Sequence, residues 1–288
     1  MIDARAFGNA VIGWYERSGR HLEMRSATSP WAILVAEVMS QQTQIGRVGP
    51  YWRRFLGRWP TPSAFAAAPT RDILEAWAGL GYNRRPLALR DAARRIVSEH
   101  GGEVPSDVAA LEALPGIGRY TARAVAANAF GSPVAPVDVN VRRVVSRVAG
   151  VGGAAVQAEA DRLIAAADPA RWVHATMDLA ATVCTRRRPR CDACPVAELC
   201  LSRGTTGDGS ATPDKKRPPF ESTSRWLRGT VLARLREAPA DGWVVFDGPI
   251  GAHDVAAVRA ALDDLAAEGF IDLGDDQVGG TEGARLRP

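Results

Sequence analysis

The sequence predicts a mainly α-helical protein that ends in a small module of helices and strands. Apolar residues recur at helical spacing through most of residues 1–200, and no convincing alternating strand pattern occurs before Val244. A stretch rich in Gly, Thr, Ser, Pro and Lys at 203–221 is typical of a linker. We therefore expect a helical domain at 1–202 and a separate module at 222–288, since 288 residues are enough for two cores.

The expected helices have recognisable start or stop signals. Ser29 and Pro30 form a cap followed by a proline, which predicts a helix over 31–42. Further helices are expected at 71–78, 86–100, 108–114, 120–130 and 139–149. In the C-terminal segment, helices are expected at 226–236 and 255–268, and short strands at 243–246 and 270–273. Two helices, each followed by a short strand, indicate a small winged-helix-like module.

Composition and charge are ordinary for a soluble protein whose larger part is basic. Hydrophobic residues make up 46% and charged residues 24% of the chain. The N-terminus lacks a secretion-signal pattern and no apolar run approaches a membrane span, so we expect a cytoplasmic protein without membrane contact. Residues 222–288 hold 7 Lys/Arg against 11 Asp/Glu, so the rest of the chain holds 29 against 21. The basic excess therefore lies where a nucleic-acid surface is expected.

All the cysteines of the chain lie within one short segment: Cys184, Cys191, Cys194 and Cys200. Their spacing, Cys-x6-Cys-x2-Cys-x5-Cys, provides four thiolates for one tetrahedral metal ion or one [4Fe–4S] cluster. A zinc site usually has two short Cys-x2-4-Cys pairs, and here only one pair is short, so the spacing favours the cluster. Zinc remains the main alternative, and a disulfide is disfavoured because nothing else indicates secretion.

The segment Leu114-Pro115-Gly116-Ile117-Gly118-Arg119 separates two predicted helices. The proline ends the first helix, and the two glycines permit a tight turn and a close backbone approach to a ligand. The next helix then presents free N–H groups and the positive end of its dipole, which can bind a phosphate without reading sequence. This is a helix-hairpin-helix signature, and an ordinary turn between helices is its alternative.

A run of basic residues, Arg186 to Arg190, lies between the first two cysteines. Such a run is usually a solvated face. A metal cluster would hold this one on a rigid loop, where Arg186 and Arg187 can bind phosphates.

Two carboxylates stand out as candidates for chemistry. Glu37 lies in the otherwise apolar helical stretch 33–39, so poor solvation is expected to raise its pKa and suit it as a general acid. The alternative interpretation is that Glu37 simply belongs to the polar face of this helix. Asp138 precedes a predicted helix and is a favoured N-cap, which by itself needs no other role. Cleavage of an N-glycosidic bond needs two such groups, one to protonate the leaving base and one to support the sugar cation.

Over residues 20–200 the chain resembles the adenine DNA glycosylases of the MutY type, which belong to the endonuclease III superfamily. The motifs that carry the resemblance are 37–44, 79–82, 114–121, 137–143, 177–179 and the cysteine loop. The resemblance implies two helical lobes with double-stranded DNA across the cleft, one [4Fe–4S] cluster, and removal of adenine mispaired with 8-oxoguanine or guanine after base flipping. It also implies a monomer that is associated with the nucleoid.

The resemblance assigns roles to residues by position. Glu37 resembles the acid that protonates adenine, and Asp138 the carboxylate that stabilises the sugar cation, with Tyr120 and Asn140 as polar neighbours. Tyr120 stands where lyase-competent relatives carry a nucleophilic lysine, so a glycosylase without strong lyase activity is expected. The residues expected to contact the duplex are Gln41, Gln42, Tyr82, Leu114, Gly116, Gly118, Arg119, Arg142, Arg186 and Arg187.

The base pocket departs from the family pattern. The usual Leu-Pro-Trp-Arg is Leu22-Glu23-Met24-Arg25 here, the usual Asn-Gln is Val173-His174, and Asn83 replaces a common aromatic residue. Met24, Arg25 and His174 are therefore the expected base-pocket residues. The alternatives are a glycosylase of the same fold for another base, such as thymine opposite guanine, and a non-catalytic iron–sulfur protein that binds DNA.

The C-terminal segment 222–288 is too short for the Nudix-like 8-oxoguanine reader of longer relatives, and its layout is similar to the short tail of actinobacterial members. We expect it to tune the preference for the opposing base or to contact a repair protein through helix 255–268.

Overall fold

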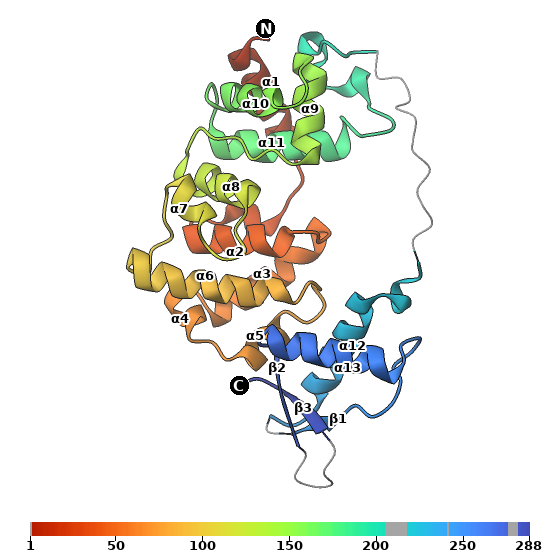
Figure 1. Cartoon of the computed structure of the whole chain (residues 1–288). Helices are drawn as coiled ribbons and strands as arrows, with labels where there is room; N and C mark the ends of the chain where they lie inside the picture. Colours follow the sequence, from red (N-terminus) through yellow and green to blue (C-terminus); the bar gives the residue numbers. More distant parts are fainter. Residues whose placement is uncertain (1, 205–217, 241, 276–281) are drawn as a thin grey trace. The chain divides into compact units, whose positions relative to one another are not determined.

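The computed structural model describes residues 2–204, 218–240, 242–275 and 282–288. The chain forms two compact units (Figure 1). Unit 1 contains Met1–Ser63 and Asp91–Thr212, and unit 2 contains Ala64–Arg90 and Pro213–Pro288. The expected helical domain at 1–202 thus contributes one internal segment to the unit that holds the C-terminal module.

Unit 1 is built of helices, as the sequence predicted. Its helices are α1 (Ala4–Ser18), α2 (Pro30–Ser40), α3 (Val48–Arg58), α7 (Val108–Glu112), α8 (Arg119–Phe130), α9 (Val139–Ala149), α10 (Ala155–Ile164) and α11 (Pro169–Thr182). Two more, α4 (Pro62–Ala66) and α6 (Arg84–His100), contain residues of both units. Short 3-10 turns occur at η1 (Glu23–Ser26), η2 (Ile45–Arg47), η3 (Cys191–Ala193) and η4 (Ala197–Leu199). Within the described residues, no strand precedes Val244.

The helices of unit 1 pack around apolar side chains that the sequence places on their inner faces. One core joins α1, α9, α10 and α11 around Phe7, Val144, Leu163 and Trp172, all of which are fully buried. Helix α2 packs against α8 and α3, and α11 also contacts α8, so α8 lies between the two groups (Figure 1). This arrangement brings α2, α8, α9 and α11 close enough to form one site.

The ends of the helices follow the local sequence. Asp138 caps α9, and Gly150 ends the same helix in the left-handed conformation. Pro30 is the first residue of α2, as predicted, but the side chain of Ser29 makes no capping hydrogen bond. Helix α2 also ends at Ser40 rather than at the predicted Gln42, because Gln41 is no longer helical and Gln42 has a positive φ of 52°.

Unit 2 contains two helices and a small sheet in addition to α5 (Thr70–Ala76). The elements are η5 (Phe220–Ser222), α12 (Ser224–Glu237), β1 (Val244–Val245), α13 (Val255–Ala267), β2 (Ile271–Asp275) and β3 (Glu282–Leu286). The sheet is antiparallel with the order β1-β3-β2, and Ala284 of β3 pairs with both Val244 and Leu273. Both predicted helices and both predicted strands are present, whereas β3 was not predicted.

Arg71 explains why Ala64–Arg90 belongs to the same unit as the C-terminal elements. Its guanidinium on α5 donates hydrogen bonds to the carbonyl oxygens of Arg236 and Ala238, at 3.3 and 2.5 Å, just where α12 ends. These carbonyls have no partner within the helix, so a cation at this position stabilises the helix end. No helix in the described parts of the chain combines the length and apolar character needed to cross a membrane.

Candidate active site

Unit 1 contains a cavity of about 580 Å³ formed by η1, α2, α8, α11 and the start of α9. It gathers nine of the residues that the sequence analysis singled out: Met24, Arg25, Glu37, Gln41, Gln42, Tyr120, Asp138, Asn140 and His174. The predicted catalytic residues and base-pocket residues therefore lie together, although they are spread over 150 positions of the sequence.

Glu37 is the one acidic residue in the buried part of α2. Its neighbours Leu34, Val35 and Ala36 are almost completely buried, and Glu37 itself lines the cavity. Burial raises the pKa of Glu37 to about 7, while a hydrogen bond from Asn128 and the charge of Arg25 act in the opposite direction. A carboxyl group with this pKa is available as an acid near neutral pH.

Asp138 has a different environment, because it lies at the N-terminus of α9. Its Oδ1 accepts hydrogen bonds from the backbone N–H groups of Asn140 and Val141, at 2.9 and 2.8 Å. The side-chain amide of Asn140 donates to Oδ2 at 2.7 Å. These three donors and the helix dipole stabilise a negative charge at this position.

Tyr120 lies near both carboxylates. Burial raises the pKa of Tyr120 well above its usual value, and the charges of Glu37 and Asp138 raise it further. Its hydroxyl group therefore stays neutral and can donate a hydrogen bond at any physiological pH. The cavity thus combines an acid with a raised pKa, a neutral phenol and a capped carboxylate.

A buried ion-pair network holds Arg25 at the wall of the cavity. Asp178 on α11, whose side chain is only 1% exposed, accepts hydrogen bonds from the guanidinium groups of Arg25 and Arg20 at 2.6 to 3.0 Å. Burial opposes ionisation of Asp178, but the hydrogen bonds from the two arginines lower its pKa below the usual value. Arg25 is also 3.3 Å from the hydroxyl oxygen of Tyr15, so its position in the cavity is fixed.

His174 lines the same wall as a neutral imidazole. Burial lowers the pKa of His174 to about 4, and the positive charge of Arg25 contributes to this shift. The imidazole packs against the ring of Tyr15, with 6.2 Å between the ring centroids. A neutral histidine offers one hydrogen-bond donor and one acceptor to a planar ligand.

Two residues of this site were missed in the sequence. Asp178 was noted only as part of a motif, because its partners Arg20 and Arg25 lie more than 150 positions away. Asn128 was not noted at all, although it is a lone amide in the apolar stretch 124–130 of α8. The signal that singled out Glu37 in α2 was also present at Asn128.

The hairpin residues lie outside the cavity, between α7 and α8. Leu114 is buried, while Gly116 has a positive φ of 74° that favours glycine at this turn. Gly118 caps α8, and a Cβ atom added there would meet nothing within 4 Å. Packing within the protein therefore does not require glycine at position 118, and the exposed Arg119 follows directly.

The remaining predicted DNA contacts are also outside the cavity. Arg142, Arg186 and Arg187 are exposed. Tyr82 belongs to unit 2, where it has a positive φ of 50° and is 36% exposed. Arg225 of the C-terminal module donates a hydrogen bond to the Tyr82 hydroxyl at 2.6 Å and lies 4.9 Å from the centre of its ring.

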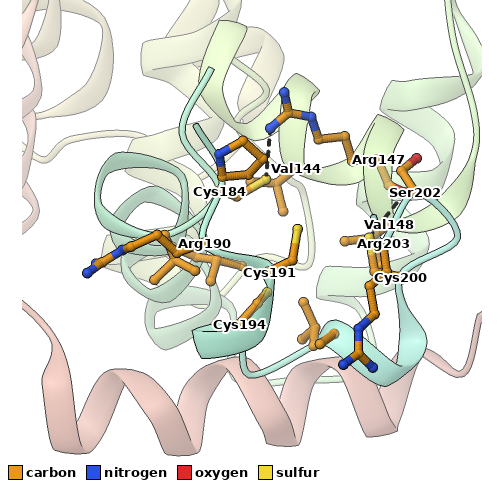
Figure 2. A pocket seen from close by; sticks show the side chains of 15 residues that line it. Val144, Arg147, Val148, Cys184, Arg190, Cys191, Cys194, Cys200, Ser202 and Arg203 are labelled. Atoms are coloured by element: carbon orange, nitrogen blue, oxygen red, sulfur yellow. Dashed lines mark hydrogen bonds between the residues drawn. The ribbon is translucent and has the colours of Figure 1, made fainter. Parts of the chain in front are cut away.

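The four cysteines surround a second, smaller cavity in unit 1, which Figure 2 shows from close by. Burial raises the pKa of Cys194 and Cys200, and the other cysteines raise it further because the thiolates repel one another. Arg147 donates a hydrogen bond to the Cys184 sulfur at 3.5 Å. No group of three or more His, Cys, Asp or Glu side chains in the described ranges is arranged to hold a single metal ion. Four thiols around one space fit a cluster with several irons.

Comparisons with known proteins agree with both sites. Residues 35–166 match the family model of the HhH-GPD superfamily base excision DNA repair proteins, and residues 184–200 match the iron–sulfur binding domain of endonuclease III. The chain is 43% identical to the adenine DNA glycosylase of Mycobacterium tuberculosis over 237 residues, covering 79% of this chain and 78% of that protein. The chain belongs to the adenine DNA glycosylases. The glycosylase of Mycolicibacterium smegmatis is 40% identical to it over 91% of both chains.

The fold comparison leads to the same superfamily. A solved structure of a thermostable thymine-DNA glycosylase superposes on 70% of this glycosylase and 97% of that chain, with a TM-score of 0.66 and 27% identity. The predicted helix-hairpin-helix glycosylase fold is thereby confirmed, and the match of residues 184–200 to the iron–sulfur binding domain confirms the predicted [4Fe–4S] cofactor. The protein is a DNA glycosylase, a hydrolase that acts on N-glycosyl bonds.

Proposed function

We propose that this glycosylase removes adenine mispaired with 8-oxoguanine or guanine by general-acid hydrolysis of the N-glycosidic bond. The observation that carries the proposal is the presence of Glu37, with a pKa of about 7, and the capped Asp138 in one cavity. Glu37 is buried, whereas Asp138 accepts three hydrogen bonds at a helix N-terminus, and these different environments suit the two carboxyl groups to different roles. A volume of about 580 Å³ accommodates a purine and its sugar once the nucleotide has left the helix.

The first step is protonation of the flipped base by Glu37. The proton neutralises the negative charge that develops on adenine as the bond between the sugar C1′ and the base nitrogen breaks, and the bonding electron pair leaves with the base. Arg25 is unsuited to supply this proton, because a guanidinium stays charged and the hydrogen bonds to Asp178 act to raise its pKa further. His174 is neutral and is suited to bind an edge of the base rather than to protonate it.

The second step is capture of the sugar cation by water. Asp138 stabilises the positive charge that develops on the sugar, and it accepts the proton of the water that supplies a hydroxyl group to C1′. Asn140 keeps the carboxylate oriented through its hydrogen bond to Oδ2. The product is then an intact abasic site.

The iron–sulfur cluster has a structural role in this scheme. Cys184, Cys191, Cys194 and Cys200 would hold it, and it would fix the loop that carries Arg186 and Arg187. With the hairpin at 114–119, this loop provides contacts to phosphates along a mismatched duplex. A monomer associated with the nucleoid in the cytoplasm is sufficient for these contacts.

The product and the substrate can be tested in one experiment. Under single-turnover conditions we expect excision of adenine opposite 8-oxoguanine and guanine, with strand breakage only after alkali. Borohydride should trap little covalent adduct, because Tyr120 occupies the position of the lysine in lyase-competent relatives. Trapping as efficient as that of a lyase would contradict the proposal.

Excision of another base is the second candidate function, and the structural match to a thymine-DNA glycosylase favours thymine. The cavity wall contains Met24, Val173 and His174 where the family pattern has other residues. A panel of duplexes with adenine, thymine or uracil opposite guanine and 8-oxoguanine separates the two functions. Faster removal of thymine than of adenine would establish the second candidate.

We further propose that the C-terminal module acts on selection of the opposing base through Tyr82. The guanidinium of Arg225 lies between the rings of Tyr82 and Phe220, 4.9 and 4.8 Å from their centres. Such contacts restrict the orientation of an exposed tyrosine. Tyr82, Gln41 and Gln42 are the residues proposed to probe the duplex opposite the flipped base. The exposed face of α13 is proposed to contact a repair protein.

Replacing Arg225 with alanine is therefore expected to lower the preference for adenine opposite 8-oxoguanine over adenine opposite guanine. The maximal rate on the better substrate should change little, because Glu37 and Asp138 are untouched. The measurement is the ratio of single-turnover rate constants for the two duplexes. Arg259→Ala on α13 removes the same charge from an exposed pair with Asp263 and serves as the control. An unchanged ratio in the Arg225 variant would remove the module from base selection.

A further inference from the structure

Asn128 is a polar residue that the proposed steps leave unused. It lies on α8 directly after Ala124, Val125, Ala126 and Ala127, which are all fully buried. Its side-chain amide lines the active-site cavity. Asn128 is half-buried, and partial desolvation of its amide costs free energy unless the polar atoms are hydrogen-bonded.

The amide is directed at the general acid. Nδ2 of Asn128 donates a hydrogen bond to Oε1 of Glu37 at 3.3 Å. Oδ1 of Asn128 is buried and has no hydrogen-bond partner among the residues that the structure describes. Oε1 keeps a lone pair whether or not Oε2 carries a proton, so it can accept this hydrogen bond in both states of the acid. Asn128 can therefore bond to Glu37 both before and after the proton leaves.

The other polar groups near Glu37 do not take the place of this hydrogen bond. Two titratable or charged groups face Glu37 from the described elements packed against α2: Arg25 on η1 and Tyr120 on α8. Asp138 and His174 line the same cavity. Arg25 donates its hydrogen bonds to Asp178, Tyr15 and the Arg20 carbonyl, and acts on Glu37 through charge alone.

We propose that Asn128 is a positioning residue for Glu37, which holds Oε1 so that Oε2 presents the proton to the flipped base. This rests on the proposed role of Glu37 as the general acid. After proton transfer the Nδ2–H group stabilises the carboxylate that forms on Glu37, so Asn128 favours transfer of the proton from Glu37 to the base. The hydrogen bond lowers the pKa of Glu37 against the effect of burial, which keeps the acid strong enough to protonate a base.

Asn128→Leu tests the proposal, because leucine has a similar volume and no hydrogen-bonding group. We expect the pH at which the single-turnover rate is half-maximal to rise by about one unit relative to the wild type. Asn128→Gln retains the amide and has room in the cavity for one more methylene group, so it should return this pH towards the wild-type value. Asn9→Leu makes the same replacement at an exposed position of α1 and should change nothing.

A second measurement separates this inference from the proposed function. Infrared difference spectra between each protein and its Glu37→Gln counterpart report the titration of Glu37 without any DNA. The inference is overturned if the Asn128→Leu protein, with normal iron content and thermal unfolding, titrates Glu37 at the wild-type pH. If the leucine variant does not fold, Asn128→Ser, whose side chain is too short to reach Glu37, replaces it in both measurements. Absence of adenine excision by the wild type would instead overturn the proposed function.

Discussion

Replacing Glu37 with glutamine is expected to slow adenine excision by roughly 10²–10⁴-fold, the usual contribution of a positioned general acid. Glutamine has the shape of the acid and can still accept a hydrogen bond from Asn128, but it carries no proton that it can transfer. Binding to a mismatched duplex should stay nearly unchanged, because Glu37 lies in the cavity rather than among the proposed phosphate contacts. The measurements are single-turnover excision and the dissociation constant for the same duplex.

The pH dependence of the wild-type excision rate is a second test of Glu37 as the general acid. Since burial raises the pKa of Glu37 to about 7, the acid is protonated below this pH and ionised above it. We expect the excision rate to be high below pH 7 and to fall as the pH rises through that value. The residual rate of the Glu37→Gln variant should lack this limb.

Glu16→Gln is the matched control for these experiments. Glu16 is exposed on α1 and pairs with Arg171, and neither residue lines the cavity, so the same change in charge and shape occurs outside the site. Its rate and pH dependence should equal those of the wild type. Near wild-type turnover by the Glu37→Gln protein would exclude Glu37 as the proton donor.

The sequence predicted those parts of the fold that depend on local rules. The limits of α9 follow from the cap at Asp138 and the glycine at 150, and both are as expected. Strand β3 was missed because Glu282–Leu286 has a glycine and an alanine where a strand usually has large apolar residues. It is stabilised by pairing with β1 and β2 and by packing against α12, which are not local features of the sequence. Similarly, Arg71 gave no sign that α5 would belong with the C-terminal elements.

In the active site, too, features set by local sequence were predictable and features set by distant contacts were not. Glu37 was predictable because a carboxylate in an apolar helix is unusual wherever that helix packs. Arg25 was also predicted to lie in the base pocket, but the ion pair that fixes it there was not, because its partner Asp178 is on a helix 153 positions away. A buried pair of this kind depends on two distant helices meeting, which no local pattern records.

Asp138→Asn is expected to be the second most damaging change, with a loss of roughly 10²–10³-fold in the excision rate. The amide can still cap α9, since asparagine and aspartate are similarly good N-caps, and the cost in stability should be less than about 1 kcal/mol. The negative charge beside the sugar is lost, however, and with it the acceptor for the proton of the attacking water. Binding of the duplex should again remain close to that of the wild type.

Asp3→Asn provides a control that separates the chemical role of Asp138 from its capping role. Asp3 caps α1 with the same geometry, since its Oδ1 accepts hydrogen bonds from the N–H groups of Arg5 and Ala6 at 2.9 and 3.1 Å. Both variants lose the charge of an N-cap, so their thermal unfolding should shift by similar small amounts. Only the Asp138 variant should lose excision. If the two variants keep equal activity, the cap is the whole function of Asp138 and the sugar cation must be stabilised by another group.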